Sequence, residues 1–319
     1  MTVPKLGGNN MIMIKKYFSA TLLSTAIALG GLSFTSPAKA EGNIVAGYIN
    51  TDLSKPVGNE SYWKSSKAFP VSLMAQPMVN PKPEKTETSM INVQAVNNGK
   101  WIAFRLKWKD TEKSEAGPLG KFSDGVAIQF PVKIVNGALP LPFMGEKGKA
   151  VHIYHWKDAF QFDKDNGRIK TTKDIYPNAS VDMYPLEPKT ETREQMKTVP
   201  ENYPKATEEQ KMVFVHGQAA GNTQSFPKLR AIDEIFAEGF GTSQVIDNHQ
   251  AIGNGRWENG EWTVVISRPL HSKIGSVLEV GKNEFVCFAV WQGGKGEVGS
   301  RKSLALSWVP LNIAKKTHP

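Results

Sequence analysis

Only one cysteine, Cys287, is present in a chain of 319 residues. A single thiol excludes a disulfide framework, a cysteine-rich zinc module and an iron–sulfur cluster held by this chain alone. It also excludes covalent attachment of a c-type haem, which needs the pattern C-x-x-C-H. Any cofactor must therefore be held without a cluster of thiolates.

Catalytic signatures are equally scarce. The sequence has no serine-centred elbow, no carboxylate dyad framework and no H-E-x-x-H pattern. His152 and His155 are three residues apart, which on a strand places them on opposite faces and argues against a shared zinc site. The glycines of residues 238–242 do not follow a predicted strand, so we interpret them as a turn. We expect no independent catalysis by this chain.

Long runs of basic residues are absent too. The formal net charge is +9, and Lys5, Lys15, Lys16 and Lys39 lie in the first 40 residues without any acid, so nine minus four leaves +5 for the rest. That excess is too small and too dispersed to predict a nucleic-acid partner. It suits docking on an acidic partner.

The first 40 residues have the three parts of a secretory signal peptide. Lys15 and Lys16 precede an apolar stretch over residues 18–32, and Ala38-Lys39-Ala40 forms an A-x-A cleavage site. A membrane anchor is the alternative, but the stretch is broken by polar residues and glycines and is shorter than the ~20 residues that a span needs. We expect cleavage after Ala40 and export to the periplasm or an equivalent compartment.

Alternating apolar and polar residues predict strands in the exported part. Residues 90–110 contain two such runs joined by Asn97-Asn98-Gly99, which predicts a hairpin. One face of the second run carries Ile102, Phe104, Leu106 and Trp108. Similar runs occur at residues 126–132, 150–156, 262–268, 284–291 and 303–309. We therefore predict an all-β fold, an antiparallel β-sandwich, formed by a single domain over residues 41–319.

Two segments depart from this pattern. Residues 228–238 place apolar side chains at helical spacing and are followed by Gly239, which predicts a short helix with a glycine cap. Residues 157–226 are rich in charge and proline and lack sustained alternation. We interpret them as a long irregular insert within the same domain, of the kind that often binds a partner.

Met144 is a candidate ligand because it lies in the loop PLPFMGEKGK, residues 140–149, directly before a predicted strand. Prolines and glycines constrain such a loop and can hold one side chain in a fixed position. A thioether is a soft, uncharged ligand that suits haem iron or copper(I). Most methionines, however, only fill space in a core, so Met144 needs a partner.

Lys302 is the second candidate. It shares the parity of Leu304, Leu306 and Trp308, so a regular strand would direct its amine toward the apolar side. Burial lowers the pKa of a lysine and leaves a neutral amine that can bind a metal. The alternative is that Lys302 lies at the mouth of the strand and extends to water.

Six blocks in order between about residues 93 and 311 carry a family resemblance. They are VQAVNNGKWIAFRLKWKD, SDGVAIQFPV, LPFMGEKGKAVHIYHWKD, AEGFGT, GRWENGEWTVVISRPL and NEFVCFAVWQGGKGEVGSRKSLALSWVPL. In these blocks the chain resembles the haem-b-binding gamma subunits of exported molybdenum enzymes of the dimethylsulfoxide reductase type. That family includes the gamma subunits of ethylbenzene dehydrogenase, dimethylsulfide dehydrogenase, chlorate and selenate reductases, and nitrite oxidoreductase.

The resemblance implies a β-sandwich similar to family 9 carbohydrate-binding modules, with a non-covalent haem b whose iron is bound by a methionine and a lysine. Carried over by motif, these ligands are Met144 and Lys302. The segment 292–295, QGGK, departs from the family pattern. The alignment with the family motif can shift at this point, so Lys295 remains an alternative to Lys302. His155 is another, since it shares a face with apolar neighbours.

The resemblance also implies a function in electron transfer. With both axial positions filled by protein, a haem iron does one-electron chemistry and does not bind substrate. The implied partners are a molybdenum-containing alpha subunit, an iron–sulfur beta subunit and a soluble cytochrome. The long insert is most similar to that of nitrite oxidoreductase and related nitrate reductases.

A non-redox function is the alternative. An exported β-sandwich could instead bind carbohydrate or another ligand on a platform of tryptophans. The candidates for such a platform are Trp101, Trp156, Trp257, Trp262 and Trp291.

Overall fold

A computed structural model describes residues 42–55, 58, 60–115, 117–170, 172–178, 220–221, 226–246 and 250–316. All of these belong to the unit Pro37–Pro319. The predicted signal peptide and most of the predicted insert lie outside the described residues and stay predictions. Within the described ranges, no helix has the length and apolar character to cross a membrane.

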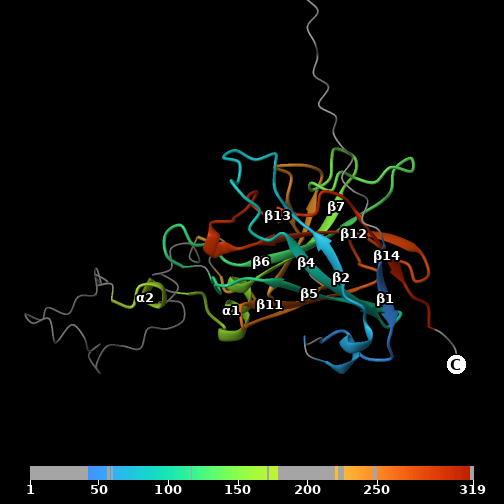
Figure 1. The fold of residues 1–319 in the computed structure, drawn as a ribbon, viewed down its shortest axis with the longest axis horizontal. Coiled ribbons are helices and arrows are strands. Elements are labelled where there is room, and N and C mark those ends of the chain that lie inside the picture. The colour runs from blue at the N-terminus through green and yellow to red at the C-terminus, as the bar shows by residue number, and fades with distance from the viewer. Residues whose placement is uncertain are drawn as a thin grey trace, which may run out of the picture. The chain divides into compact units, whose positions relative to one another are not determined.

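The regular structure is dominated by β-strands (Figure 1). The strands are β1 (Ile44–Tyr48), β2 (Phe69–Ser72), β3 (Met74–Ala75), β4 (Met90–Asn97), β5 (Trp101–Lys109), β6 (Gly125–Pro131), β7 (Val151–Lys157), β8 (Ile232–Ala237), β9 (Gln244–Val245), β10 (Ile252–Glu258), β11 (Glu261–Pro269), β12 (Asn283–Trp291), β13 (Ser303–Leu304) and β14 (Val309–Ile313). The helices are α1 (Asp158–Asn166), α2 (Thr172–Ile175) and the 3-10 turns η1 (Ser61–Ser65) and η4 (Gly293–Lys295). The prediction of an all-β fold is confirmed.

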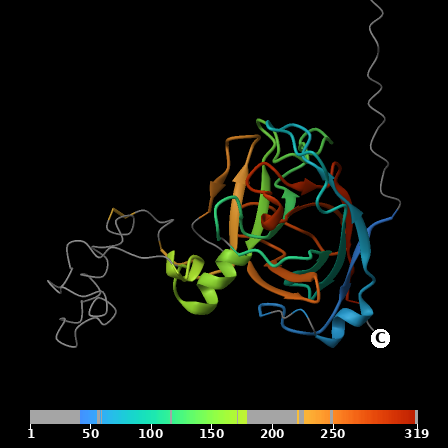
Figure 2. The ribbon, with the colours of Figure 1, turned by 60° about the vertical axis from the view of Figure 1, so that its left-hand side comes forward.

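One strand, β12, joins two halves of a continuous sheet. Its first residues pair with β14 and its last residues pair with β6, so the path runs β10-β11-β5-β4-β1-β14-β12-β6-β7-β8-β9. The strands curl around a shared interior, as Figure 2 shows. Most pairs are antiparallel, but β1 runs parallel to both β4 and β14. The two layers of the predicted antiparallel sandwich are therefore formed by one continuous sheet, which contains both parallel and antiparallel strand pairs.

Side-chain alternation sorts the sheet into two faces. The inner face of β5 is fully buried, as its pattern predicts, and Trp108 on it stacks against Trp262 at 6.0 Å. In β6 and β7 the inner face contributes Phe130 and Trp156 to the same core. The outer face of these two strands builds a second, smaller apolar cluster that includes Ile153. This outer cluster carries the candidate site.

The helix predicted over residues 228–238 is wrong. Residues 232–237 form β8, which pairs with β7 along its whole length, and Leu229 is 89% exposed instead of buried. Over so short a segment, the helical spacing of apolar residues is only a weak determinant of structure. Pairing with a neighbouring strand and the β-branched side chains of two isoleucines favour a strand instead. The strand predicted over 303–309 is also interrupted, since β13 ends at Leu304 and β14 begins at Val309.

Glu297 and three aspartates, Asp110, Asp124 and Asp158, are almost completely buried. Burial raises the pKa of Glu297 to about 7 and gives similar values for Asp124 and Asp158. The folded protein thus keeps protons that the unfolded chain releases near pH 4. The stability that these groups contribute is present at low pH and is lost as the pH rises through about 7.

The variant Glu297→Gln should remove the pH-dependent stability that one such group contributes. We expect the free energy of unfolding of the native protein, relative to the variant, to fall by about 1–3 kcal/mol between pH 5 and pH 8. Urea unfolding at several pH values measures this difference. A difference that stays constant over that range would contradict the raised pKa.

Two glycines of β10 allow it to lie against the inner face of β7 and β8. A Cβ at Gly255 would come within 2.1 Å of the buried Trp156 ring, and a Cβ at Gly253 within 2.5 Å of Ile232. We expect Gly255→Ala to lower the free energy of unfolding by about 1–3 kcal/mol, because the packed indole has no space to move. Urea unfolding is the measurement.

The matched control for this substitution is Gly47→Ala in β1, where an added Cβ meets nothing within 4 Å. It should be neutral or stabilise by up to about 1 kcal/mol. Equal losses in the two variants would show that the contact with Trp156 is not the cause.

Candidate cofactor site

Met144 adopts a backbone conformation that is rare outside glycine. Its φ is 69°, and the following Gly145 has φ 78°. A Cβ at Gly145 would lie 2.7 Å from the carbonyl oxygen of Lys149, so only glycine fits there. A left-handed methionine costs about 1–3 kcal/mol, and such strain is typical of functional positions. The loop therefore fixes where the thioether lies.

Contacts from three other elements hold this loop in place. The Trp308 indole donates a hydrogen bond to the carbonyl oxygen of Pro140 at 2.7 Å, and the Gln129 amide donates to that of Pro142 at 3.1 Å. The backbone N–H of Gly239 donates to the carbonyl oxygen of Met144 at 2.8 Å. The predicted turn at residues 238–242 thus contacts Met144 directly.

Lys302 lines the same cavity as Met144. Its Nζ is 5.0 Å from the centroid of the Trp291 ring, which places a cation-binding face beneath the amine. The Gln76 N–H donates to its carbonyl oxygen at 2.9 Å, which fixes its backbone beside β3. Burial lowers the pKa of Lys302 to about 8. A neutral amine is therefore accessible near physiological pH.

The segment that leads to Lys302 is organised by buried carboxylates. Glu297 accepts hydrogen bonds from the Gln292 N–H at 2.8 Å and from the Ser303 hydroxyl at 3.0 Å. Asp124 accepts from the Gly293 N–H at 2.8 Å. These bonds close the loop between β12 and β13 and fix the register of Lys302.

Met144 and Lys302, which are 302 − 144 = 158 residues apart, line one narrow cavity of about 40 Å³. Apolar residues from the outer face of the sheet, such as Ala127 and Ile153, form part of its wall. The two predicted site residues are thus brought together by the fold.

The other predicted ligands lie elsewhere. Lys295 lines a separate cavity together with Arg301 and residues of the loop 81–87. His155 is on the same face as Ile153, as predicted, and its ring stacks on Trp291 at 4.4 Å. Burial, followed by the charges of Lys157 and Lys302, lowers the pKa of His155 far below its usual value. His155 is therefore neutral but does not line the cavity of Met144.

The donor chemistry of the cavity fits haem iron. It offers one thioether and one amine of lowered pKa, set in mainly apolar walls, which is a soft and weakly charged ligand pair. The space of about 40 Å³ is smaller than a porphyrin, so the cavity has to open to admit one.

Sequence reasoning missed the residues that position the ligands. Glu297 lies in the glycine-rich segment GKGEVG, and its neighbours in the sequence do not predict that its side chain is buried. Gln129 follows the strand pattern, but its bond to the loop depends on a tertiary contact. Trp291 was a candidate for a sugar platform and instead forms the floor beneath Lys302.

The tryptophan platform itself is not present. Trp156 and Trp262 are fully buried in the core and Trp291 is 6% exposed, so none of the three offers a free face to a sugar. Only Trp101 and Trp257 are partly exposed among the five candidates.

Comparison with known proteins gives both sequence and structural matches. A heme subunit of a respiratory nitrate reductase, ORF7 of Haloferax mediterranei, is 22% identical over 247 residues, or 76% of this chain and 63% of the relative. The chlorate reductase gamma subunit of Ideonella dechloratans is 23% identical over 230 residues, or 71% of this chain and 66% of the relative. The chain thus matches just under two thirds of the length of each.

A family 9 carbohydrate-binding module from Caldicellulosiruptor kristjanssonii, solved with glucose, is 7% identical. The match covers 87% of this chain and 98% of that module, with a TM-score of 0.37.

The family described as "Ethylbenzene dehydrogenase" matches residues 60–303, which include both Met144 and Lys302. This range covers more than three quarters of the chain and nearly all of the sheet. The chain belongs to the ethylbenzene dehydrogenase family.

Proposed function

We propose that this protein holds a non-covalent haem b between Met144 and Lys302 and serves as the electron-transfer subunit of a molybdenum oxidoreductase. One observation carries the proposal: a strained methionine and a lysine with a pKa of about 8 line the same cavity. The relatives named as a nitrate reductase heme subunit and a chlorate reductase gamma subunit support it.

Each residue has a distinct role in this proposal. Met144 would hold the iron through a thioether presented by a loop that backbone hydrogen bonds fix in place. Lys302, once it has lost its proton, would hold the iron through a neutral amine. Bound haem supplies one-electron transfer. The stacked rings of Trp291 and His155 lie beside the Lys302 amine, and burial lowers the pKa of this lysine so that its proton is more readily lost.

The proposed partners follow from the family. A subunit without a catalytic motif would receive or deliver electrons through an iron–sulfur beta subunit, next to a molybdenum-containing alpha subunit, with a soluble cytochrome as the other redox partner. We place the complex in the periplasm or an equivalent compartment on the basis of the predicted signal peptide. Among related enzymes, the long insert favours the nitrite oxidoreductase or nitrate reductase type.

Replacement of either ligand should change the haem spectrum. We expect Met144→Ala and Lys302→Ala, loaded with haem, to lose the low-spin b-type bands and to bind haem at least about tenfold more weakly, because an axial position is left open. Absorption spectroscopy and haem titration of the purified protein measure both effects.

Lys147→Ala is the matched control, since Lys147 is exposed on the same loop and does not line the cavity. It should bind haem with native spectra. Unchanged low-spin bands in Met144→Ala, with native stability in urea, would overturn the ligand assignment. If the native protein binds no haem when haem is supplied in excess, the proposed function itself would be overturned.

A further inference from the structure

A second cavity lies where the two ends of the curled sheet meet. β10 is at one end of the strand path, and it packs against β7 and β8 near the other end. Glu234 of β8 accepts a hydrogen bond from the Ala251 N–H at 2.6 Å, which ties the start of β10 to β8. The groove beside this seam has a volume of about 650 Å³ and shares no residue with the cavity of Met144.

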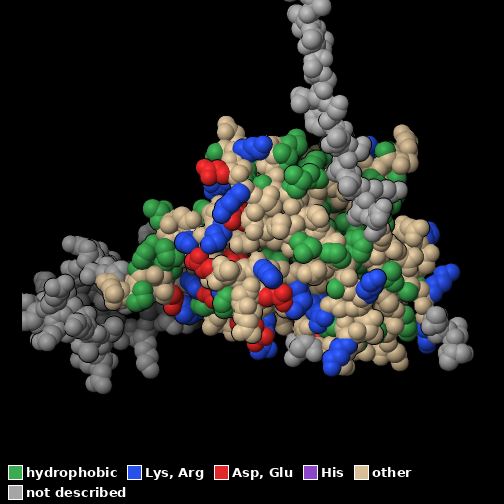
Figure 3. All heavy atoms as spheres, viewed as in Figure 1, with side chains coloured by type: hydrophobic (Ala, Val, Ile, Leu, Met, Phe, Trp, Pro, Cys, Tyr) green, Lys and Arg blue, Asp and Glu red, His purple; other side chains and the backbone are tan. Residues whose placement is uncertain are grey.

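Four cationic side chains from separate segments surround the groove: Lys55, Lys164, Arg230 and Lys273. Among the described residues that line it, none is an aspartate or a glutamate. Lys164 pairs with the neighbouring Asp165, whereas the ion pairs of the described residues include none of the other three. On the face seen in Figure 3, by contrast, basic and acidic side chains lie close together. Arg230 and Lys273 therefore bring positive charge to the groove that no ion pair among the described residues offsets.

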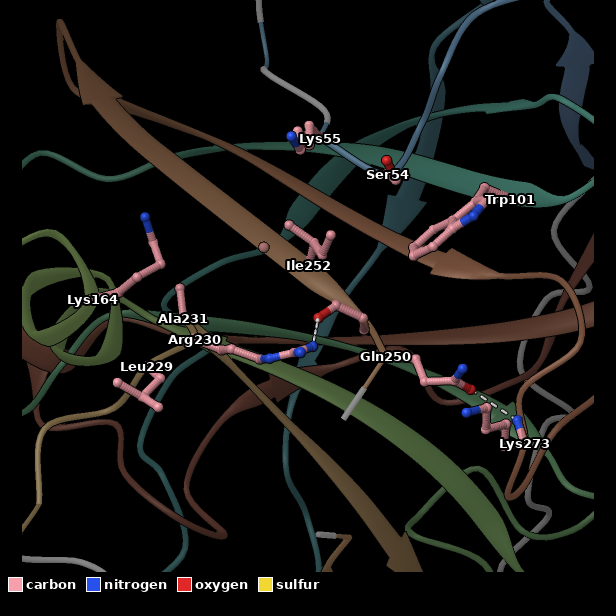
Figure 4. Close-up of a pocket in the computed structure, with 12 residues that line it drawn as sticks. Ser54, Lys55, Trp101, Lys164, Leu229, Arg230, Ala231, Gln250, Ile252 and Lys273 are labelled. Carbon is pink, nitrogen blue, oxygen red and sulfur yellow. Dashed lines mark hydrogen bonds between the residues drawn. The ribbon is translucent and has the colours of Figure 1, made fainter. Parts of the chain in front are cut away.

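Apolar side chains also line the groove, between the cationic ones. Figure 4 shows Trp101 toward one end of the groove, Lys164 toward the other and Ile252 between them. Leu229, which is 89% exposed, also lines it. A ligand that covers these side chains gains apolar burial in addition to charge neutralisation.

The edge of β10 that faces away from β11 is mostly occupied by other groups of the protein. This strand pairs with β11 on one side only, and the Gly255 N–H donates to the Gln161 side chain at 3.1 Å instead of to β11. Because strand hydrogen bonding alternates every two residues, Gly253 also faces away from β11. Gly253 lines the groove but is buried, and on the same edge the Ala251 carbonyl accepts from Arg230 at 3.4 Å, so β10 offers little free backbone to a ligand.

We propose that this groove binds an extended acidic peptide segment of a partner protein, in which at least one apolar side chain alternates with the carboxylates. The four cations select negative charge, and Trp101 and Leu229 accept the apolar residue. A single oxoanion would leave most of 650 Å³ and the apolar side chains uncovered. The inference is independent of haem binding.

Fluorescence anisotropy of the whole chain with a labelled peptide, Glu-Leu-Glu-Val-Glu-Glu, tests the proposal. We expect binding that weakens as salt increases, and no binding of the matched peptide Lys-Leu-Lys-Val-Lys-Lys. The double variant Lys55→Gln with Lys273→Gln should bind the acidic peptide about tenfold more weakly. Both lysines are exposed and outside the ion pairs, so the fold should be unaffected.

The control is Lys67→Gln with Lys147→Gln, which removes the same charge from exposed positions outside the groove. It should change the affinity less than twofold. Equal losses in the two double variants, or equal binding of the lysine peptide, would overturn the proposal. Binding of inorganic phosphate without binding of the peptide would also overturn it and assign the groove to small anions. Met144→Ala should bind the peptide normally, which separates this test from that of haem binding.

Discussion

The alternation of side chains along β6, β7 and β12 is the constraint on which the rest of this structure depends. Every second residue, such as Phe130 and Trp156, faces the core, and the residues between them face the candidate site. One sheet layer therefore stabilises the fold and forms the wall of the cavity. A shift of register by one residue would exchange the two faces and would lose both.

Two loops complete the site, and different forces hold them. The loop with Met144 is fixed by backbone hydrogen bonds and by left-handed conformations that only a closely supported chain maintains. The segment with Lys302 is fixed by buried carboxylates, chiefly Glu297, whose raised pKa makes the support depend on protonation. The ligands are thus positioned partly by cavity residues such as Gln129 and partly by groups outside it, such as Glu297.

Charge is distributed differently in the two cavities. The cavity of Met144 is narrow and mainly apolar, and its one amine has a lowered pKa. The groove at the seam is wide and is surrounded by four cations. The first arrangement favours a neutral, tightly enclosed group, whereas the second favours an anionic ligand that remains in contact with water.

The sequence alone determined the strand class, the hairpin at residues 90–110 and the two residues of the candidate site, because these depend on local alternation and on motifs that carry the family resemblance. The helix predicted from the sequence for residues 228–238 was wrong. Apolar residues there have helical spacing, but residues 232–237 pair with β7 and form a strand. The sequence named Lys302 with Lys295 and His155 as alternatives, and which of these shares a cavity with Met144 depends on the path of the loop after β12. The tertiary structure decided that proximity, and it also decided which tryptophans are buried and where four distant cations lie together, because burial and proximity arise only when separated segments pack together.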